Sequence, residues 1–269
     1  ALMVGAGGTS VFVHELMPDH TWRNTGVVVD TRANSTGDAL WSVRDSRLYV
    51  ASRAPGSNLL VTALTYASGS RSWSVVPGFP VTVNSGGGSE SATIDQDSLG
   101  HLWVTYTRGA RLWVAHSTNA ARTTWTAGFQ PNVPDTVLKS DDISALITFG
   151  NSIGLMWSDQ ESAAFRFAVR DVNATDTAPW QVEDALAGTG LADDHINLKQ
   201  LTGDPQGRIF AAVKTSTGDA TDADPNAPLV GVLTRTPGTG GAPADWSFTQ
   251  AGTVAQDWTR PILMIDDTN

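Results

Sequence analysis

Four acidic residues recur in this chain at one fixed interval. Asp38, Glu90, Asp142 and Asp194 follow one another in steps of 52 residues (90−38, 142−90, 194−142). Five tryptophans recur at nearly the same spacing, with steps of 51, 52, 55 and 66 residues between Trp22, Trp73, Trp125, Trp180 and Trp246. A fixed period in this range is typical of a repeated supersecondary unit. The chain therefore folds as a repeat, and the structure of one unit predicts the structure of the others.

Each repeat contains four short apolar runs separated by turn residues, with almost no helical periodicity. In the third repeat, residues 91–95, 101–106 and 111–116 read as strands, and a looser fourth strand follows Trp125. Four antiparallel strands in about 50 residues make the blade of a β-propeller. We therefore predict an all-β chain, folded as a β-propeller of four-stranded antiparallel blades in a single domain over residues 1–269.

The period also sets the boundaries of the blades. Four blades are predicted at 38–89, 90–141, 142–193 and 194–259. Residues 1–37 supply strands two to four of a further blade, and Arg260 to Asp266 read as its missing first strand. This pattern favours five blades, with the ring closed between N- and C-terminal strands. The alternative is a piece of a six- or seven-bladed propeller.

Composition limits the partners and the compartment. Lys and Arg total 17 against 27 Asp and Glu, and the resulting net charge of −10 disfavours nucleic acid and anionic membranes. No apolar run is long enough for membrane insertion, and the absence of Cys excludes disulfides and thiolate chemistry. Many small polar residues and ten Trp are typical of secreted bacterial β-proteins. We therefore expect an extracellular chain from which any signal peptide has been removed.

One hairpin resembles the Asp-box of sialidase-like propellers. The stretch from Ser117 to Trp125 keeps the Ser of that motif and its Thr-Trp ending, with Asn119 in place of Asp, but it lacks the Gly and is one residue longer. The stretch from Ser68 to Trp73 resembles the motif less closely. The resemblance implies a fold and no activity, because the Asp-box is a structural turn. The arginine triad and the Tyr–Glu pair expected of a sialidase are not found in the sequence.

Other segments resemble different propellers. Residues 192–199, 141–144 and 260–262 are similar to segments of uncharacterised secreted bacterial propeller proteins, a likeness that implies no known reaction. A five-bladed ring also resembles the architecture of arabinanase- and fructosidase-type glycosidases. In those enzymes carboxylates stand at the starts of the innermost strands. This likeness is architectural, and fold alone does not determine function.

The repeat acids predict a site at one mouth of the central channel, where the first strands of all blades begin. Asp38, Glu90, Asp142 and Asp194 should form a partial ring there, with Arg260 in the fifth place. Neighbouring carboxylates cannot all stay ionised, so either a carboxyl pKa rises or a divalent cation binds at the mouth. We expect further ligand-binding side chains at the rim, where loops open on the same face: Arg53, Tyr106, Gln160, Lys214, His195 and Trp258.

Such groups bind sugar hydroxyls and pyranose faces. The first hypothesis is therefore an extracellular lectin-like protein that binds a glycan or a glycan-bearing partner at the mouth. The alternative is a carbohydrate-active enzyme, a glycoside hydrolase or polysaccharide lyase, with Glu90 and Asp142 as its catalytic pair. Those two carboxyls would then lie about 5 to 9.5 Å apart. The third reading is a scaffold in which the acids only accept backbone N–H bonds from the next blade.

Overall fold

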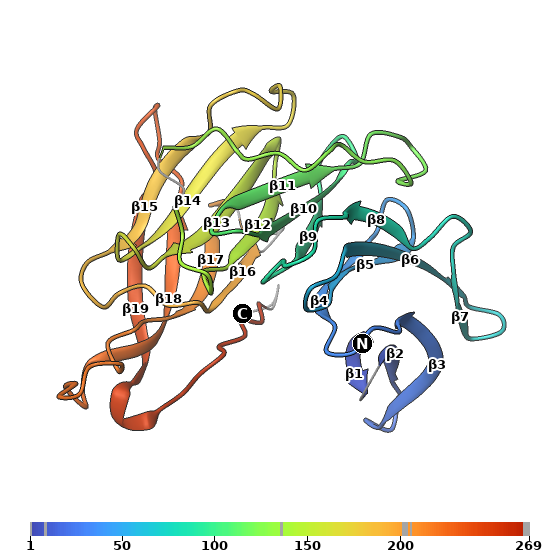
Figure 1. The fold of residues 1–269 in the computed structure, drawn as a ribbon, viewed down its shortest axis with the longest axis horizontal. Helices are drawn as coiled ribbons and strands as arrows, with labels where there is room; N and C mark the ends of the chain where they lie inside the picture. The colour runs from blue at the N-terminus through green and yellow to red at the C-terminus, as the bar shows by residue number, and fades with distance from the viewer. Residues whose placement is uncertain (1, 8–9, 135–136, 201–203, 205, 266–269) are drawn as a thin grey trace. The chain divides into compact units, whose positions relative to one another are not determined.

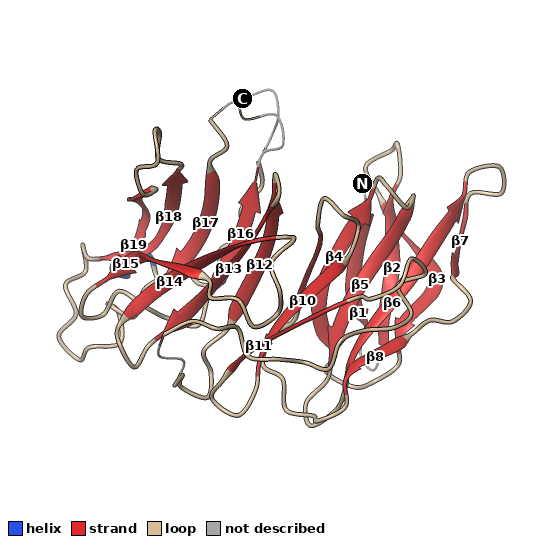
Figure 2. Cartoon of the chain, turned by 90° about the horizontal axis from the view of Figure 1, so that it is seen from above, coloured by secondary structure: helices blue, strands red, loops and turns tan. Residues whose placement is uncertain are grey.

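The computed structural model describes residues 2–7, 10–134, 137–200, 204 and 206–265. Within these residues the chain is built from antiparallel strands and one short 3-10 turn at Val254–Gln256, which confirms the all-β prediction (Figure 2). Strands that follow one another in sequence pair with one another, and they form five successive sheets in the described residues. No helix among these residues is long and apolar enough to cross a membrane.

The chain divides into two compact units, one formed by residues 1–108 and 113–129 and the other by 109–112 and 130–269. The first unit contains three sheets, ordered β1-β2-β3, β4-β5-β6-β7 with β8 also paired to β6, and β9-β10-β11 (Figure 1). Their bounds are β1 Leu2–Gly7, β2 Ser10–Leu16, β3 Trp22–Asp30, β4 Thr36–Ser42, β5 Arg47–Arg53, β6 Leu59–Ala67, β7 Ser72–Val75, β8 Val81–Asn84, β9 Thr93–Gln96, β10 Leu102–Thr107 and β11 Leu112–His116. The loose fourth strand predicted after Trp125 is reduced to isolated bridges, Ser117 with Trp125 and Val114 with Phe129.

The second unit contains two complete four-stranded sheets, β12-β13-β14-β15 and β16-β17-β18-β19. Their bounds are β12 Ser144–Phe149, β13 Ser152–Asp159, β14 Ala164–Asp171, β15 Gln181–Ala187, β16 Ile196–Gln200, β17 Ile209–Lys214, β18 Pro228–Thr236 and β19 Asp245–Thr253. The four later sheets begin at Thr36, Thr93, Ser144 and Ile196, within two or three residues of the boundaries predicted at 38, 90, 142 and 194. The division of the chain into the predicted blades stays a prediction.

One predicted strand is wrong. Residues 261–265 form no strand, and residue 266 lies outside the described part of the chain. Arg260 adopts a left-handed backbone with φ of 51°, and Pro261 has no N–H to donate to a sheet ladder. Instead of pairing as a strand, the segment runs beside β16, where the Leu263 N–H donates to Asn197 Oδ1 at 3.0 Å. Closure of a ring by this strand is therefore not supported, and the number of blades in a closed ring stays a prediction.

The core of the second unit lies between its two sheets. Buried apolar side chains of β12–β15, such as Met156 and Phe167, pack in one cluster with Ile209, Val213 and others from β16–β19. At the outer strands, the Glu183 carboxylate on β15 accepts hydrogen bonds from the Arg235 Nε and Nη2 atoms on β18, at 2.8 and 2.6 Å. The first strands of the two sheets, β12 and β16, also contact each other.

Candidate functional site

Four ionisable side chains gather at the start of β16, those of Asp193, Asp194, His195 and Lys214, and we call them the Asp193 cluster. The Nδ1 atom of His195 lies 2.6 Å from the Asp194 carboxylate and 3.2 Å from the Asp193 carboxylate. The Lys214 ammonium on β17 forms a salt bridge with the other Asp193 oxygen. Two backbone bonds fix the arrangement, because Asp194 N–H donates to Asp193 Oδ1 at 2.6 Å and Lys214 N–H donates to the His195 carbonyl at 3.2 Å.

The two adjacent carboxyls of this cluster titrate far apart. Burial raises the pKa of Asp194 to about 6, and the neighbouring Asp193 carboxylate adds to the effect. Burial also opposes ionisation of Asp193, but hydrogen bonds from His195, Asp194 and Lys214 outweigh it and hold the pKa of Asp193 well below its usual range. Asp193 therefore stays ionised while Asp194 keeps a proton into the mildly acidic range. A carboxyl whose pKa is raised in this way can act as a general acid.

At the equivalent place in the neighbouring sheet, the buried acid is Asp142, which is fully shielded from solvent. Its carboxylate accepts the Lys139 N–H at 2.8 Å and two donors of Gln160, the backbone N–H at 3.3 Å and Nε2 at 3.0 Å. Burial raises the pKa of Asp142. The period equates Asp142 with Asp194, but in the second doublet, Asp193-Asp194, the more buried acid is Asp193, which pairs with Lys214. The first strands of the two sheets still begin 52 residues apart, at Ser144 and Ile196, so the two doublets differ in which acid is buried.

These contacts give Asp142 a structural role, which leads to a first prediction. Replacing Asp142 by Ala should lower the free energy of unfolding by about 2 to 3 kcal/mol, because buried donors lose their acceptor. Urea unfolding measures the effect, and Asp141→Ala at the exposed neighbouring position should change it by less than about 0.5 kcal/mol. An Asp142→Ala variant of unchanged stability would contradict this role.

The Asp193 cluster continues across the sheet as a row of paired residues. His195 stands beside Lys214, Lys214 pairs with Val230 on β18, and Val230 pairs with Gly252 on β19. The indole of Trp258 covers Gly252, where an added Cβ would lie only 2.7 Å from its Cε3 atom. Neighbouring strands are about 4.8 Å apart, so the row spans roughly 14 Å. It places charged groups at one end and an aromatic ring at the other.

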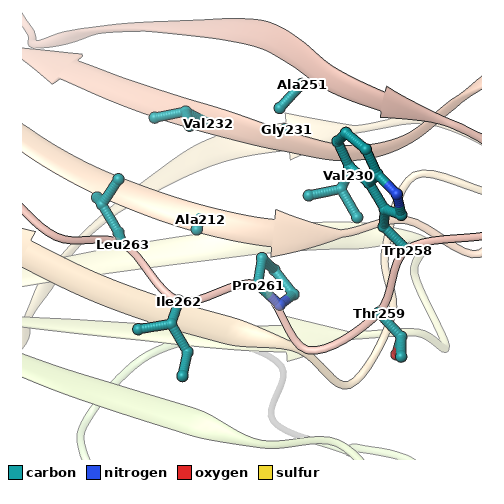
Figure 3. Close-up of a pocket in the computed structure, with 10 residues that line it drawn as sticks. All are labelled: Ala212, Val230, Gly231, Val232, Ala251, Trp258, Thr259, Pro261, Ile262 and Leu263. Carbon is teal, nitrogen blue, oxygen red and sulfur yellow. The ribbon is translucent and has the colours of Figure 1, made fainter. Parts of the chain in front are cut away.

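A pocket of about 310 Å³ lies along this row. It is lined by Ala212, Val230, Gly231, Val232, Ala251, Trp258, Thr259, Pro261, Ile262 and Leu263. Figure 3 shows the segment from Thr259 to Leu263 running along the strands, with the Trp258 ring at one end. Half of the Trp258 surface is exposed, so its ring is free to stack on a ligand. Of the predicted site residues, Trp258 lines this pocket, while His195 and Lys214 belong to the Asp193 cluster.

The predicted site residues of the first unit have other surroundings. Asp38 accepts the Ile94 N–H of the next sheet at 3.2 Å, which is the structural contact of the scaffold reading. The exposed carboxylate of Glu90 lies 3.8 Å from the Arg53 guanidinium. Tyr106 is only 1% exposed and packs inside the core, where burial raises its pKa. The prediction that Tyr106 presents its ring at the rim is therefore wrong, because both faces of β10 are covered and all six of its residues are buried.

Arg260 is exposed, on a turn rather than at the start of a strand. A common mouth for all the repeat acids involves residues of both compact units and stays a prediction. Sequence reasoning did not assign a site role to Asp193 or to Asp141, although the signal was present. The doublets Asp141-Asp142 and Asp193-Asp194 repeat at the same interval of 52 (193−141). A doublet offers two carboxyls at one strand start, and burial selects between them.

The Asp193 cluster also offers ligand atoms to a metal. One atom each from Asp193, Asp194 and His195 lie within 4.8 Å of one another. A divalent cation bound there would compete with the Lys214 ammonium for Asp193, because both neutralise the same carboxylate. The predicted cation at the channel mouth therefore stays a prediction, and these three residues are the ones that would hold it.

No protein-family model matches the chain, and no curated protein matches it in sequence. Solved structures do resemble it. An engineered GH43 glycoside hydrolase with endo-xylanase and exo-arabinofuranosidase activity superposes with a TM-score of 0.54 at 10% identity, over 89% of this chain and 48% of that one. The periplasmic gluconolactonase of Pseudomonas aeruginosa gives 0.52 at 12% identity, over 91% and 66%. The GH43_1 enzyme of Xanthomonas citri complexed with xylotriose gives 0.50 at 12% identity, over 94% and 85%.

This chain spans about half the length of the engineered hydrolase. At such low identity the comparisons bear on the fold alone. Together with the succession of antiparallel sheets, they confirm the predicted β-propeller class, without the Asp-box of the sialidase type in particular.

Proposed function

We propose that this chain is an extracellular carbohydrate-active protein that hydrolyses glycosidic bonds at the Asp193 cluster. The observation that carries the proposal is the geometry of the Asp193 cluster, in which Asp194 contacts His195 and stands next to an Asp193 that is paired with Lys214. Burial and the neighbouring Asp193 carboxylate raise the pKa of Asp194 to about 6, which suits a proton donor. Glycoside hydrolysis needs one carboxylic acid that protonates the leaving oxygen and one carboxylate that acts on the anomeric carbon directly or through water. Asp194 would be the acid.

The second carboxylate would be Asp141. Asp193 is unsuited, because it is adjacent to Asp194 and already paired with Lys214, leaving no space for a sugar between the two. Asp141 is exposed at the start of the neighbouring sheet, and its negative charge contributes to the raised pKa of Asp194. Its carboxylate thus acts on Asp194 through space, as expected of a group on the other side of a bound sugar. This pair replaces Glu90 and Asp142 as the candidate catalytic pair.

The pocket beside the cluster would bind the rest of the glycan. An exposed indole stacks on the apolar face of a pyranose, while ammonium and carboxylate groups bind hydroxyls. Trp258 and Lys214 stand at opposite ends of the row described above, so one oligosaccharide could contact both. The solved structures that share the fold include glycoside hydrolases and an enzyme complexed with xylotriose, which supports the choice of substrate class.

A direct test combines a hydrolysis screen over xylo-, arabino- and hexo-oligosaccharides with one binding variant. Trp258→Ala should raise KM by about tenfold, the loss of one stacked ring, while kcat stays within about twofold. Trp22→Ala is a matched control, because Trp22 is 47% exposed and Trp258 is 50% exposed. Equal KM values for Trp258→Ala and the unmodified protein would remove the pocket from the site. Absence of turnover on every oligosaccharide would contradict hydrolysis.

Binding without turnover is the second candidate, and one observation favours it. Several candidate carboxylates are already engaged, Asp142 by buried donors and Glu90 by the guanidinium of Arg53. A lectin-like protein would show saturable binding on a glycan array with no product release. In that case Trp258→Ala would weaken binding, and Asp194→Asn would weaken it only modestly.

A further inference from the structure

A second, smaller pocket lies in the first unit, between the outer strands β3 and β7 of two adjacent sheets. Its volume is about 140 Å³, and its lining mixes polar side chains with the apolar surfaces of Val27 and Trp73. Arg23, Asn24 and Thr25 come from β3, while Arg71, Ser72 and Trp73 come from the turn into β7 and from β7 itself. The pocket is smaller than the roughly 300 Å³ at which sites for drug-sized molecules begin, so it fits one small unit rather than an oligomer.

The charges at this pocket do not cancel. The Arg23 guanidinium lies 2.5 Å from the Glu15 carboxylate, its cross-strand partner, so this charge is neutralised. Arg71 is exposed on a turn, and among the described residues no acidic side chain forms a salt bridge with it. The Arg23 Nη2 atom also lies 3.5 Å from the Arg71 carbonyl oxygen, which places the two arginines side by side. The pocket thus presents one uncompensated guanidinium in a chain whose net charge is −10.

The other lining groups suit a sugar. Trp73 is held in place by Tyr66, with ring centroids 4.9 Å apart, and by Trp41 at 6.3 Å, so its indole has a fixed orientation. Asn24 uses its carbonyl oxygen to accept the Gly26 N–H at 2.9 Å, which leaves its amide NH₂ as the group that can donate to a ligand. A guanidinium binds a carboxylate through two parallel hydrogen bonds, and an indole binds the apolar face of a sugar ring.

We infer that this pocket binds a single acidic sugar residue, a hexuronate whose carboxylate pairs with Arg71 and whose ring lies against Trp73. The site is separate from the Asp193 cluster and does not need hydrolysis there. It would be an accessory site that captures a uronate-bearing glycan.

The test is calorimetric titration of the full chain with sodium glucuronate, glucose and sodium acetate. Glucuronate should bind saturably, with glucose and acetate at least about tenfold weaker, because each lacks half of the recognised chemistry. Arg71→Ala should weaken glucuronate binding by about tenfold or more, the loss of a charged hydrogen-bonded pair. Arg111→Ala removes another exposed arginine and should leave binding unchanged. A thermal melt of each variant confirms that it folds.

The outcomes separate the parts of the inference. Equal binding of glucuronate by Arg71→Ala and the unmodified protein overturns the site. If glucose binds as tightly as glucuronate, the inference that the ligand is acidic is wrong. If acetate binds as tightly as glucuronate, the inference that the ligand is a sugar is wrong. The same titration with Asp194→Asn should be unaffected. If glucuronate binding is lost in that variant, the ligand occupies the Asp193 cluster instead, whereas loss of hydrolysis alone concerns only the proposed function.

Discussion

The Asp194→Asn variant is expected to lose glycoside hydrolysis, with kcat reduced by about 10²- to 10⁴-fold, the usual contribution of one general acid. Asn is close to Asp in size, and it can donate a hydrogen bond but cannot release a proton to the leaving oxygen. The measurement is steady-state hydrolysis of an aryl glycoside or of the best oligosaccharide from the screen. The exposed Asp219→Asn variant serves as a control and should retain full activity.

The pH profile gives this prediction a signature that a structural role would not produce. Because the pKa of Asp194 is about 6, its proton is present below that pH and lost above it. The value of kcat/KM should therefore fall as the pH rises through 6. A profile that is flat from pH 5 to 8 would contradict the role of Asp194 as the acid.

Asp194 should also make the free energy of unfolding depend on pH, in a direction that follows from its raised pKa. Between about pH 4 and 6 the folded chain holds a proton on Asp194 that the unfolded chain has released, so this contribution to stability falls as pH rises through that window. Asp194→Asn should therefore be more stable than the unmodified protein at pH 7. It should also remove this part of the pH dependence. Urea unfolding at several pH values measures both effects.

The second large effect is expected when the ion pair between the two sheets of the second unit is broken. Replacing Arg235 by Met should lower the free energy of unfolding by about 3 kcal/mol, because it leaves the Glu183 carboxylate without its bidentate partner. The side chains of Arg235 and Glu183 are only 10% and 19% exposed, so water replaces the lost contact poorly. The indole Nε1 of Trp246 still donates to Glu183 at 2.8 Å, which limits the loss.

A double variant distinguishes the effect of leaving Glu183 without an ion-pair partner from the effect of losing the packing of the Arg235 side chain. Adding Glu183→Gln to Arg235→Met removes the unpaired charge and should recover part of the lost stability, as measured by urea unfolding. Arg23→Met is the matched control, since the Arg23 side chain is 44% exposed in its salt bridge and should contribute less than about 1 kcal/mol. An Arg235→Met variant as stable as this control would show that the buried pair does not hold the sheets together.

Position in the repeat does not by itself determine which side chains are exposed. His195, Lys214 and Trp258 were expected together from their places in the repeat, and their common site stays a prediction. Strand register does pair Lys214 with Val230 and Val230 with Gly252, against which the Trp258 ring lies. Tyr106 was expected at the rim from the same reasoning, but it is buried. The reason is that neighbouring elements cover both faces of β10, so that all of its residues are buried whichever way they point.

The sequence by itself determined the all-β class and the succession of antiparallel sheets, because the strands that pair are adjacent in sequence and are separated by turn residues that recur along the chain. Only the tertiary structure decided which acid of each doublet is buried and which keeps its proton. Asp193 meets Lys214, and Asp142 meets Gln160, through strand register. A pKa depends on burial and on distances to neighbouring charges, and these are set when the sheets pack.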